Sequence, residues 1–342
     1  MLEKNKILQY LKTIYTKTEA ELEKHLIERF ENKYTDSYHE NGSYHFFYNE
    51  SPLLLVAHLD TVHKQLPGIF ISTDGYTYSA ENGIGADDRN GVVAILELYE
   101  MCLDNNMQPP SILFTCKEEI GGVGVKKFAK NDDLLDKISN KNLFIQFDRR
   151  GENDFVTYGY RNNTLFEIIE SYNFVQSFGS YTDISTLMQE TRIMGVNFSA
   201  GYHNAHRIDE YTNFLELQEN IIKVFDMFPS FTQEKFVAKE EYLEPMLNYS
   251  SFMYNDRFEQ LSLFEDDYMY IISGEELYEI IESGELDYVI HSGEFTIFDC
   301  AITELYKFYP EEYVNIISKA IMSGNTDIIK KNDLQEEDVY EI

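Results

Sequence analysis

The sequence predicts an α/β protein, a layered sandwich of helices around a mixed, largely parallel sheet, followed by an acidic C-terminal segment. Apolar runs typical of buried strands alternate with helical patterns through residues 1–232, and this alternation indicates a parallel sheet with crossover helices. Turn signals near the start of the chain predict antiparallel hairpins in addition to the parallel strands. The composition changes after Pro229, because residues 233–342 carry 7 basic and 26 acidic side chains.

The N-terminal third is expected to contain helices, two hairpins and one buried strand. Apolar residues recur at helical spacing through residues 3–30. Asn41-Gly42 and Asp74-Gly75 are hairpin turn signals, one between residues 34 and 48 and one between 69 and 79. Between them, the apolar run from Leu53 to Leu59 predicts a fully buried strand.

The middle of the chain continues the alternation of strands and helices. Glycines and aspartates at residues 81–91 predict a loop that caps a helix running through residue 98. Strands are expected at residues 111–116, 142–147, 155–160 and 193–198, and helices at 164–172, 183–188 and 214–228. Residues 1–232 are expected to form one catalytic domain. Residues 233–342 would form an acidic, mostly helical segment of unknown role.

Charge and cysteine content exclude several classes of protein. A net charge of −32 would repel nucleic acid and anionic membrane surfaces. Three scattered cysteines form no disulfide framework, and no apolar run reaches the roughly 20 residues of a membrane span. We therefore expect a cytoplasmic protein with no nucleic-acid or membrane partner.

Carboxylates and histidines follow the ends of the predicted strands, where open α/β sheets bind ligands. His58 and Asp60 follow the first buried strand, and their spacing allows both side chains to face one pocket. The other groups at or near strand ends are Asp87, Glu118, Glu119, Asp148 and His203. Imidazole and carboxylate ligands suit divalent metals, and a two-metal site needs one bridging carboxylate with further ligands on each side.

These motifs, in this order, resemble those of the co-catalytic dizinc exopeptidases of the M20, M28 and M42 families. The segments that carry the resemblance are Ala57-His58-Leu59-Asp60, Gly85-Ala86-Asp87-Asp88-Arg89, Glu118-Glu119-Ile120-Gly121 and Gly201-Tyr202-His203-Asn204-Ala205-His206. Peptidase T-like M20 members are the most similar. The resemblance implies a three-layer αβα sandwich, but the short intervals between motifs leave no room for the lid or dimerisation domain usual in M20 and M42 members.

The resemblance also implies a role for each residue. Asp87 would bridge two divalent metals, zinc or else cobalt or manganese. His58 and Asp148 would complete one site, and Glu119 and His203 the other. Glu118 would act as general base and Asp60 would orient His58.

Some assignments have competitors in the sequence. His206 competes with His203 for the last ligand position, and Asp154 is an alternative to Asp148. His45 has no metal ligands near it in the sequence and is interpreted as a surface or packing residue, and Cys116 as a buried strand residue.

The predicted function is a metallopeptidase, an exopeptidase that acts on short peptides, most simply an aminopeptidase. A deacylase of N-acyl amino acids could use the same site. A non-catalytic binding protein on a peptidase scaffold is a third alternative, which the complete ligand set disfavours.

Overall fold

The computed structural model describes residues 2–177, 179 and 181–240, and beyond these residues 270–272, 281, 286, 295–297 and 317. The chain falls into two units, Met1–Tyr242 and Leu243–Ile342. In the second unit, β15 (Tyr270–Ile272) pairs in parallel with β16 (Phe295–Ile297). The predicted helices of this acidic segment lie largely outside the described residues.

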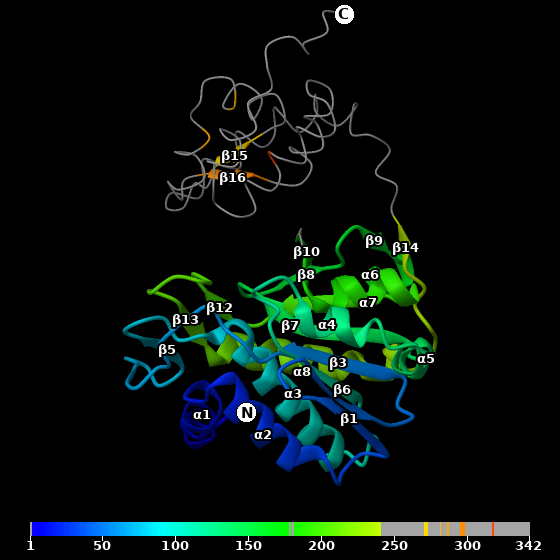
Figure 1. Ribbon diagram of the computed structural model, residues 1–342, viewed down its shortest axis with the longest axis horizontal. Helices are drawn as coiled ribbons and strands as arrows, with labels where there is room; N and C mark the ends of the chain where they lie inside the picture. The colour runs from blue at the N-terminus through cyan, green and yellow to red at the C-terminus, as the bar shows by residue number, and fades with distance from the viewer. Residues whose placement is uncertain are drawn as a thin grey trace, which may run out of the picture. The chain divides into compact units, whose positions relative to one another are not determined.

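An eight-stranded mixed sheet in the order β1-β2-β6-β3-β7-β11-β8-β10 organises the first unit (Figure 1). Its members are β1 (Asp36–Glu40), β2 (Tyr44–Tyr48), β3 (Leu53–His58), β6 (Ser111–Thr115), β7 (Leu143–Arg149), β8 (Asp154–Val156), β10 (Val175–Gln176) and β11 (Gly195–Ser199). The four central strands β6, β3, β7 and β11 run parallel, and β2 joins their edge as half of an antiparallel hairpin. The predicted mixed, largely parallel sheet is confirmed.

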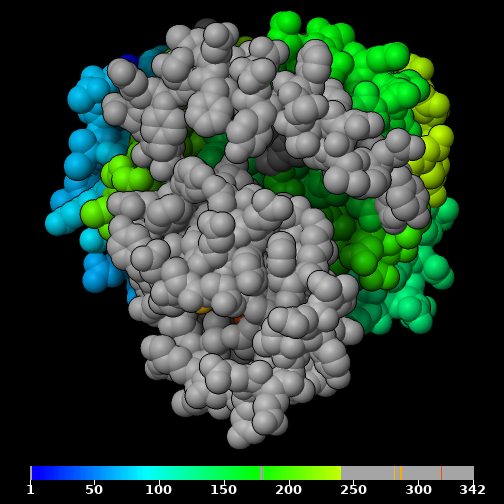
Figure 2. Space-filling model, turned by 90° about the horizontal axis from the view of Figure 1, so that it is seen from above, coloured from blue at the N-terminus to red at the C-terminus, as the bar shows by residue number. Residues whose placement is uncertain are grey.

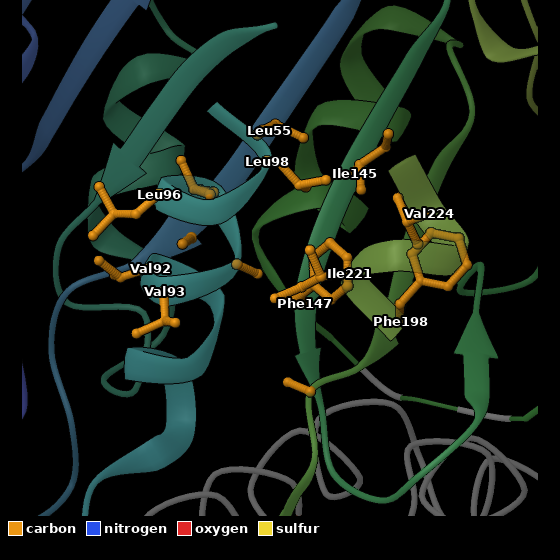
Figure 3. Packing of buried hydrophobic residues seen from close by; sticks show 14 of the residues in the cluster. Leu55, Val92, Val93, Leu96, Leu98, Ile145, Phe147, Phe198, Ile221 and Val224 are labelled. Atoms are coloured by element: carbon orange, nitrogen blue, oxygen red, sulfur yellow. The ribbon is translucent and has the colours of Figure 1, made fainter. Parts of the chain in front are cut away.

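Helices cover both faces of this sheet, because successive residues of a buried strand point to opposite sides. On one face, Leu55 of β3 and Ile145 of β7 join the core formed by α3 (Ala86–Asp104) and α8 (Phe214–Phe231), as Figure 3 shows. On the other face, Leu54 and Val56 pack with residues of α4 (Val123–Phe128), α5 (Asp132–Ser139) and α7 (Asp183–Thr191). The result is the expected three-layer αβα sandwich.

The N-terminal helices extend the layer that contains α3. They are α1 (Lys4–Tyr10), the π-helix η1 (Leu11–Tyr15) and α2 (Glu19–Phe30). Thr18 and Glu21 form a capping box at the start of α2. The apolar side of α2 packs into the same core through Leu22, Leu26 and Phe30.

The second predicted hairpin does not lie at the edge of the main sheet. β4 (Phe70–Ile71) and β5 (Thr77–Ala80) belong to a separate four-stranded sheet in the order β12-β13-β5-β4. β13 (Tyr211–Asn213) occupies the free edge of β5, and β12 (Tyr202–His203) pairs with β13. These light-blue and yellow-green segments lie side by side at one end of the first unit in Figures 1 and 2.

The first unit continues past residue 232. The predicted strand at 155–160 divides into β8 and β9 (Tyr160–Arg161), with a turn at Tyr158 and Gly159, whose φ angles are positive. β14 (Lys239–Glu240) pairs with β9, and Phe236 and Ala238 are buried in the core. α6 (Asn163–Ser171) follows β9 and packs into the core layer of α3 and α8. Among the described residues, no helix is both long and apolar enough to cross a bilayer.

Candidate metal centre and active site

The candidate site lies where the parallel strands end. His58 is the last residue of β3 and is paired in register with Thr115 of β6, so the segments after both strands start from one edge of the sheet. The His58 side chain is 1% exposed. Its Nδ1 lies 3.3 Å from Oδ1 of Asp60. The predicted spacing of His58 and Asp60 therefore brings the two side chains together.

Asp60 also holds the segment that carries both glutamates. The backbone N–H of Glu118 donates to Oδ1 of Asp60 over 2.9 Å, and the N–H of Glu119 donates to Oδ2 over 3.1 Å. These bonds hold the turn after β6 against the end of β3. Asp60 thus contacts His58 on one side and fixes the backbone of the glutamate pair on the other.

Asp87 lies at the start of α3, where the backbone is not yet helical. Gly85 has a left-handed conformation with φ of 68°, and Asp87 and Asp88 depart from helical angles. The carboxylate of Glu210 accepts the N–H groups of Gly85, Ala86 and Asp87 over 2.8, 2.9 and 3.2 Å. Because Glu210 is fully buried, it fixes the loop that presents Asp87.

The neighbouring Asp88 makes hydrogen bonds to the backbone. Its carboxylate accepts the N–H of Gly91 over 2.9 Å and that of His58 over 3.2 Å. Asp88 therefore caps α3, as the sequence indicates, and links this helix to β3.

The carboxylate of Asp87 lies between two histidines. Its Oδ1 is 3.1 Å from Nε2 of His58, and its Oδ2 is 3.2 Å from Nε2 of His206. His206 Nε2 is also 3.2 Å from Oε2 of Glu119. Asp148 approaches from β7, with Oδ1 3.6 Å from Nε2 of His58. The ligand atoms thus form two groups, and each group includes one oxygen of Asp87.

Of the two histidines that compete in the sequence, His206 lies beside Asp87 and Glu119, whereas the predicted ligand His203 lies elsewhere. Nε2 of His203 lies 2.7 Å from Oε2 of Glu216, and its ring stacks on Tyr211. Pairing of β12 with β13 holds His203 there. Three residues later the backbone turns at His206, with φ of 66°, and this turn directs His206 to Asp87 and Glu119.

The donor set fits divalent cations. Oε1 of Glu119 is buried and makes no hydrogen bond with any described residue. His58, Asp87 and Glu119 offer ligand atoms within 4.8 Å of one another, as do His58, Asp88 and Asp148. Several buried carboxylates beside two imidazoles would repel one another without cations to balance them.

Hydrogen bonds to these carboxylates control protonation of the histidines. Burial lowers the pKa of His58, but hydrogen bonds to Asp148, Asp60 and Asp87 outweigh it and hold the pKa well above its usual range. Hydrogen bonds to Asp87 and Glu119 raise the pKa of His206 to about 10. Both imidazoles must lose a proton before they can bind a metal.

Among the described residues, Glu118 forms no hydrogen bond or ion pair with His58 or His206, whereas Oε2 of its neighbour Glu119 lies 3.2 Å from Nε2 of His206. Burial raises the pKa of Glu118 to about 9, and the charges of Asp148, Asp183 and Glu119 act in the same direction. Two cations nearby would stabilise its ionised form. A carboxylate that is partly buried, close to the ligands and not bonded to the imidazoles is suited to accept and return a proton.

Two supporting residues lie at the start of α7. The Thr182 hydroxyl donates to Oδ2 of Asp148 over 2.7 Å. Asp183 is fully buried, and its Oδ2 accepts a hydrogen bond from the Thr115 hydroxyl at the end of β6. Burial raises the pKa of Asp183 to about 6. This contact of Asp183 cannot be predicted from local sequence, since its partner Thr115 lies 68 residues away.

Comparisons with known proteins match part of this chain to a family of peptidases. Residues 38–194 match the family described as peptidase family M28. A protein of Emericella nidulans named as a probable carboxypeptidase is 33% identical over 84 residues, which cover 24% of this chain. The match covers 20% of that relative's length.

Solved structures show the same fold at low sequence identity. The aminopeptidase PepT of Bacillus cereus superposes with a TM-score of 0.55 at 13% identity, covering 68% of this chain and 99% of its own. A tripeptidase of Staphylococcus aureus gives a TM-score of 0.54 at 13% identity, with the same coverage. Residues 38–194 therefore match peptidase family M28, and this match supports the predicted class of metallopeptidase hydrolase. The predicted closeness to M20 members and the lack of an inserted lid stay predictions.

Proposed function

We propose that this chain is a metal-dependent exopeptidase that removes residues from short peptides, with an aminopeptidase as its simplest form. The observation that carries the proposal is the placement of Asp87, which directs one carboxylate oxygen to His58 and the other to His206. This is the arrangement expected of a carboxylate shared by two metal ions. The names of the similar aminopeptidase and tripeptidase structures support the choice of short peptides.

Five side chains would hold the two cations. Asp87 would be shared, His58 and Asp148 would complete one group, and Glu119 and His206 the other. His206 replaces His203 of the sequence-based set. When bound, two divalent ions such as zinc polarise the scissile carbonyl and lower the pKa of water toward neutrality.

Glu118 would carry out the proton transfers. In its ionised form it takes a proton from the attacking water and returns it to the leaving amine. Asp60 keeps it in place through the backbone N–H of Glu118 and the adjoining N–H of Glu119. Asp60 also lies close enough to His58 to orient its ring, as a partner of a metal-bound histidine does.

The test of this proposal separates chemistry from metal binding. Glu118→Gln should lower kcat on a tripeptide by about 10²- to 10⁴-fold while the metal content stays unchanged. Glu190→Gln, an exposed change on α7, should leave kcat unchanged. Loss of metal from the Glu118 variant would show that the roles of Glu118 and Glu119 are exchanged.

The substrate class requires a second assay. Zinc-, cobalt- and manganese-loaded protein should be tested on tripeptides with free or blocked N-termini and on N-acyl amino acids. Turnover of free tripeptides supports the aminopeptidase, whereas turnover of N-acyl amino acids alone would identify a deacylase. We further propose a cytoplasmic location, which the unpaired buried thiols of Cys102 and Cys116 support.

A further inference from the structure

A second group of metal-binding side chains lies apart from the residues described above. It consists of Glu23 on α2, His45 on β2 and Cys116 directly after β6. Their carboxylate oxygen, imidazole nitrogen and thiol sulfur all lie within 4.8 Å of one another, and all three residues are buried. This group cannot be recognised from a local sequence motif, because its members are separated by 22 and 71 positions.

His45 is already held in the orientation of a ligand. Its Nδ1 lies 3.2 Å from Nδ1 of His39, and its Nε2 faces Oε2 of Glu23 at 2.7 Å. A metal-bound histidine normally uses its other ring nitrogen in such a hydrogen bond, which fixes the ring. The Glu23 carboxylate is oriented as well, since it accepts the N–H of Gly42 over 2.8 Å.

A further carboxylate lies beside the thiol. Glu19 accepts the N–H of Lys117 over 3.2 Å, and its side chain interacts with the thiol of Cys116. Burial of the thiol and the negative charges of Glu19 and Glu23 raise the pKa of Cys116. Two carboxylates around a buried thiol and imidazole give a cation four protein donors within reach.

We propose that Glu23, His45 and Cys116 form a third metal site, which binds one zinc-type cation with Glu19 or water as the fourth ligand. Thiolate and imidazole together select zinc over magnesium, calcium and manganese. On binding, the Cys116 thiol releases its proton to solvent. The Nε2 proton of neutral His45 moves to its Nδ1, which then donates to His39.

The location of the group gives this cation a structural role. Cys116 lies two residues before Glu118, and its N–H donates to the carbonyl of Ser43 over 2.9 Å. A cation bound to Cys116, His45 and Glu23 therefore joins α2 and β2 to the segment that carries Glu118 and Glu119. The site would hold this segment in place without contacting substrate.

Cobalt substitution distinguishes this site from the candidate active site, whether or not the peptidase proposal is correct. A thiolate bound to Co²⁺ gives a charge-transfer band in the near ultraviolet, and none of the ligands around Asp87 is a cysteine. The full chain, freed of metal and titrated with Co²⁺, should develop this band. Cys116→Ser should lack the band and bind one cobalt ion fewer than the unaltered chain.

Matched variants complete the experiment. Cys102→Ser alters the other described buried thiol, and Cys300→Ser the remaining cysteine, and both should keep the band. His45→Gln retains the thiol and should weaken cobalt binding at this site by at least about 10-fold. If circular dichroism shows that Cys116→Ser does not fold, His45→Gln decides alone. Cobalt binding without a band in the unaltered chain, or a band that persists in folded Cys116→Ser, overturns the proposal.

Discussion

His203 and His206 are three residues apart and occupy different environments. His203 lies in β12, pairs with Glu216 and stacks on Tyr211. His206 follows a turn and reaches both Asp87 and Glu119. Of these two histidines, only His206 is therefore positioned to bind a cation together with Asp87.

We expect His206→Gln to weaken binding of one metal ion by about 100-fold, whereas His203→Gln should bind both ions normally. The variants are matched in residue type and lie in the same loop. Equilibrium dialysis against zinc with elemental analysis measures the difference. Loss of metal from the His203 variant alone would support the choice made from the sequence.

Protonation of Glu118 should affect the stability of the metal-free protein. Burial, with the charges of nearby carboxylates, raises its pKa from 4.5 to about 9. Between these pH values the folded state holds a proton that the unfolded chain has released. The contribution of Glu118 to the free energy of unfolding is therefore present at pH 5 and is lost as the pH rises toward 9.

Urea unfolding in a chelator at pH 6 and pH 8 tests this expectation. The unaltered chain should lose stability between the two pH values, and Glu118→Gln should lose less. His58 and His206 also have raised pKa values and act in the same direction, so the comparison of the two proteins isolates Glu118. An equal loss in both proteins would contradict the predicted titration.

Local sequence motifs can identify only part of the candidate metal centre. His58, Asp60, Asp87, Glu118, Glu119 and Asp148 could be found because each belongs to a short motif at or near a strand end. Glu210 and Asp183 could not, since their roles depend on backbone and hydroxyl partners 68 to 125 residues away. The choice between His203 and His206 depends on a positive φ at His206, which residue type does not predict outside glycine.

At the scale of elements, the loop before α3 depends on a residue from the far end of the domain. Glu210 accepts three successive N–H groups there, and Nε2 of His63 lies 2.6 Å from its Oε2. The amide introduced by Glu210→Gln would retain only one acceptor oxygen. Its own N–H groups would face the N–H groups of the loop.

We expect Glu210→Gln to lower the free energy of unfolding by about 2–3 kcal/mol, because bonds from N–H groups to a buried charge are lost. Glu219→Gln is the control, since the Glu219 side chain is 64% exposed and forms an ion pair with Lys223 on the same helix. Its effect should stay within about 0.5 kcal/mol. Urea unfolding of both variants checks the prediction, and equal effects would exclude the buried role of Glu210.

The central elements of the fold could be predicted and the small sheet could not. Continuous apolar runs such as Leu53 to Leu59 identify central strands wherever they occur. β12 and β13 are two and three residues long, too short for a periodic pattern. The pairing of β13 with β5 joins segments more than 130 residues apart, which no local signal specifies.

For the whole molecule, the structure gives a reason to place the end of the first unit beyond residue 232. The N–H of Phe236 donates to the carbonyl of Asn142, and the N–H of Ala238 donates to that of Arg192. The Phe236 side chain is 1% exposed and packs against Phe231. These contacts join the chain after α8 to the segments that precede β7 and β11 of the main sheet.

Truncation after residue 232 should therefore destabilise the first unit relative to truncation after residue 242. The difference in the free energy of unfolding should be about 3 kcal/mol or more, the usual cost of removing a buried phenylalanine side chain. Thermal and urea unfolding of the two truncated proteins measure it. Equal stability would place the domain boundary at 232.

The contacts of Glu210 also constrain when the site can form during synthesis. The loop of Asp87 leaves the ribosome more than 120 residues before the carboxylate that fixes it, and His206 emerges only shortly before Glu210. At about 5–20 residues per second, several seconds or more separate the synthesis of the Asp87 loop from that of Glu210. The candidate metal centre can therefore take its final form only after the chain has been synthesised at least as far as Glu210.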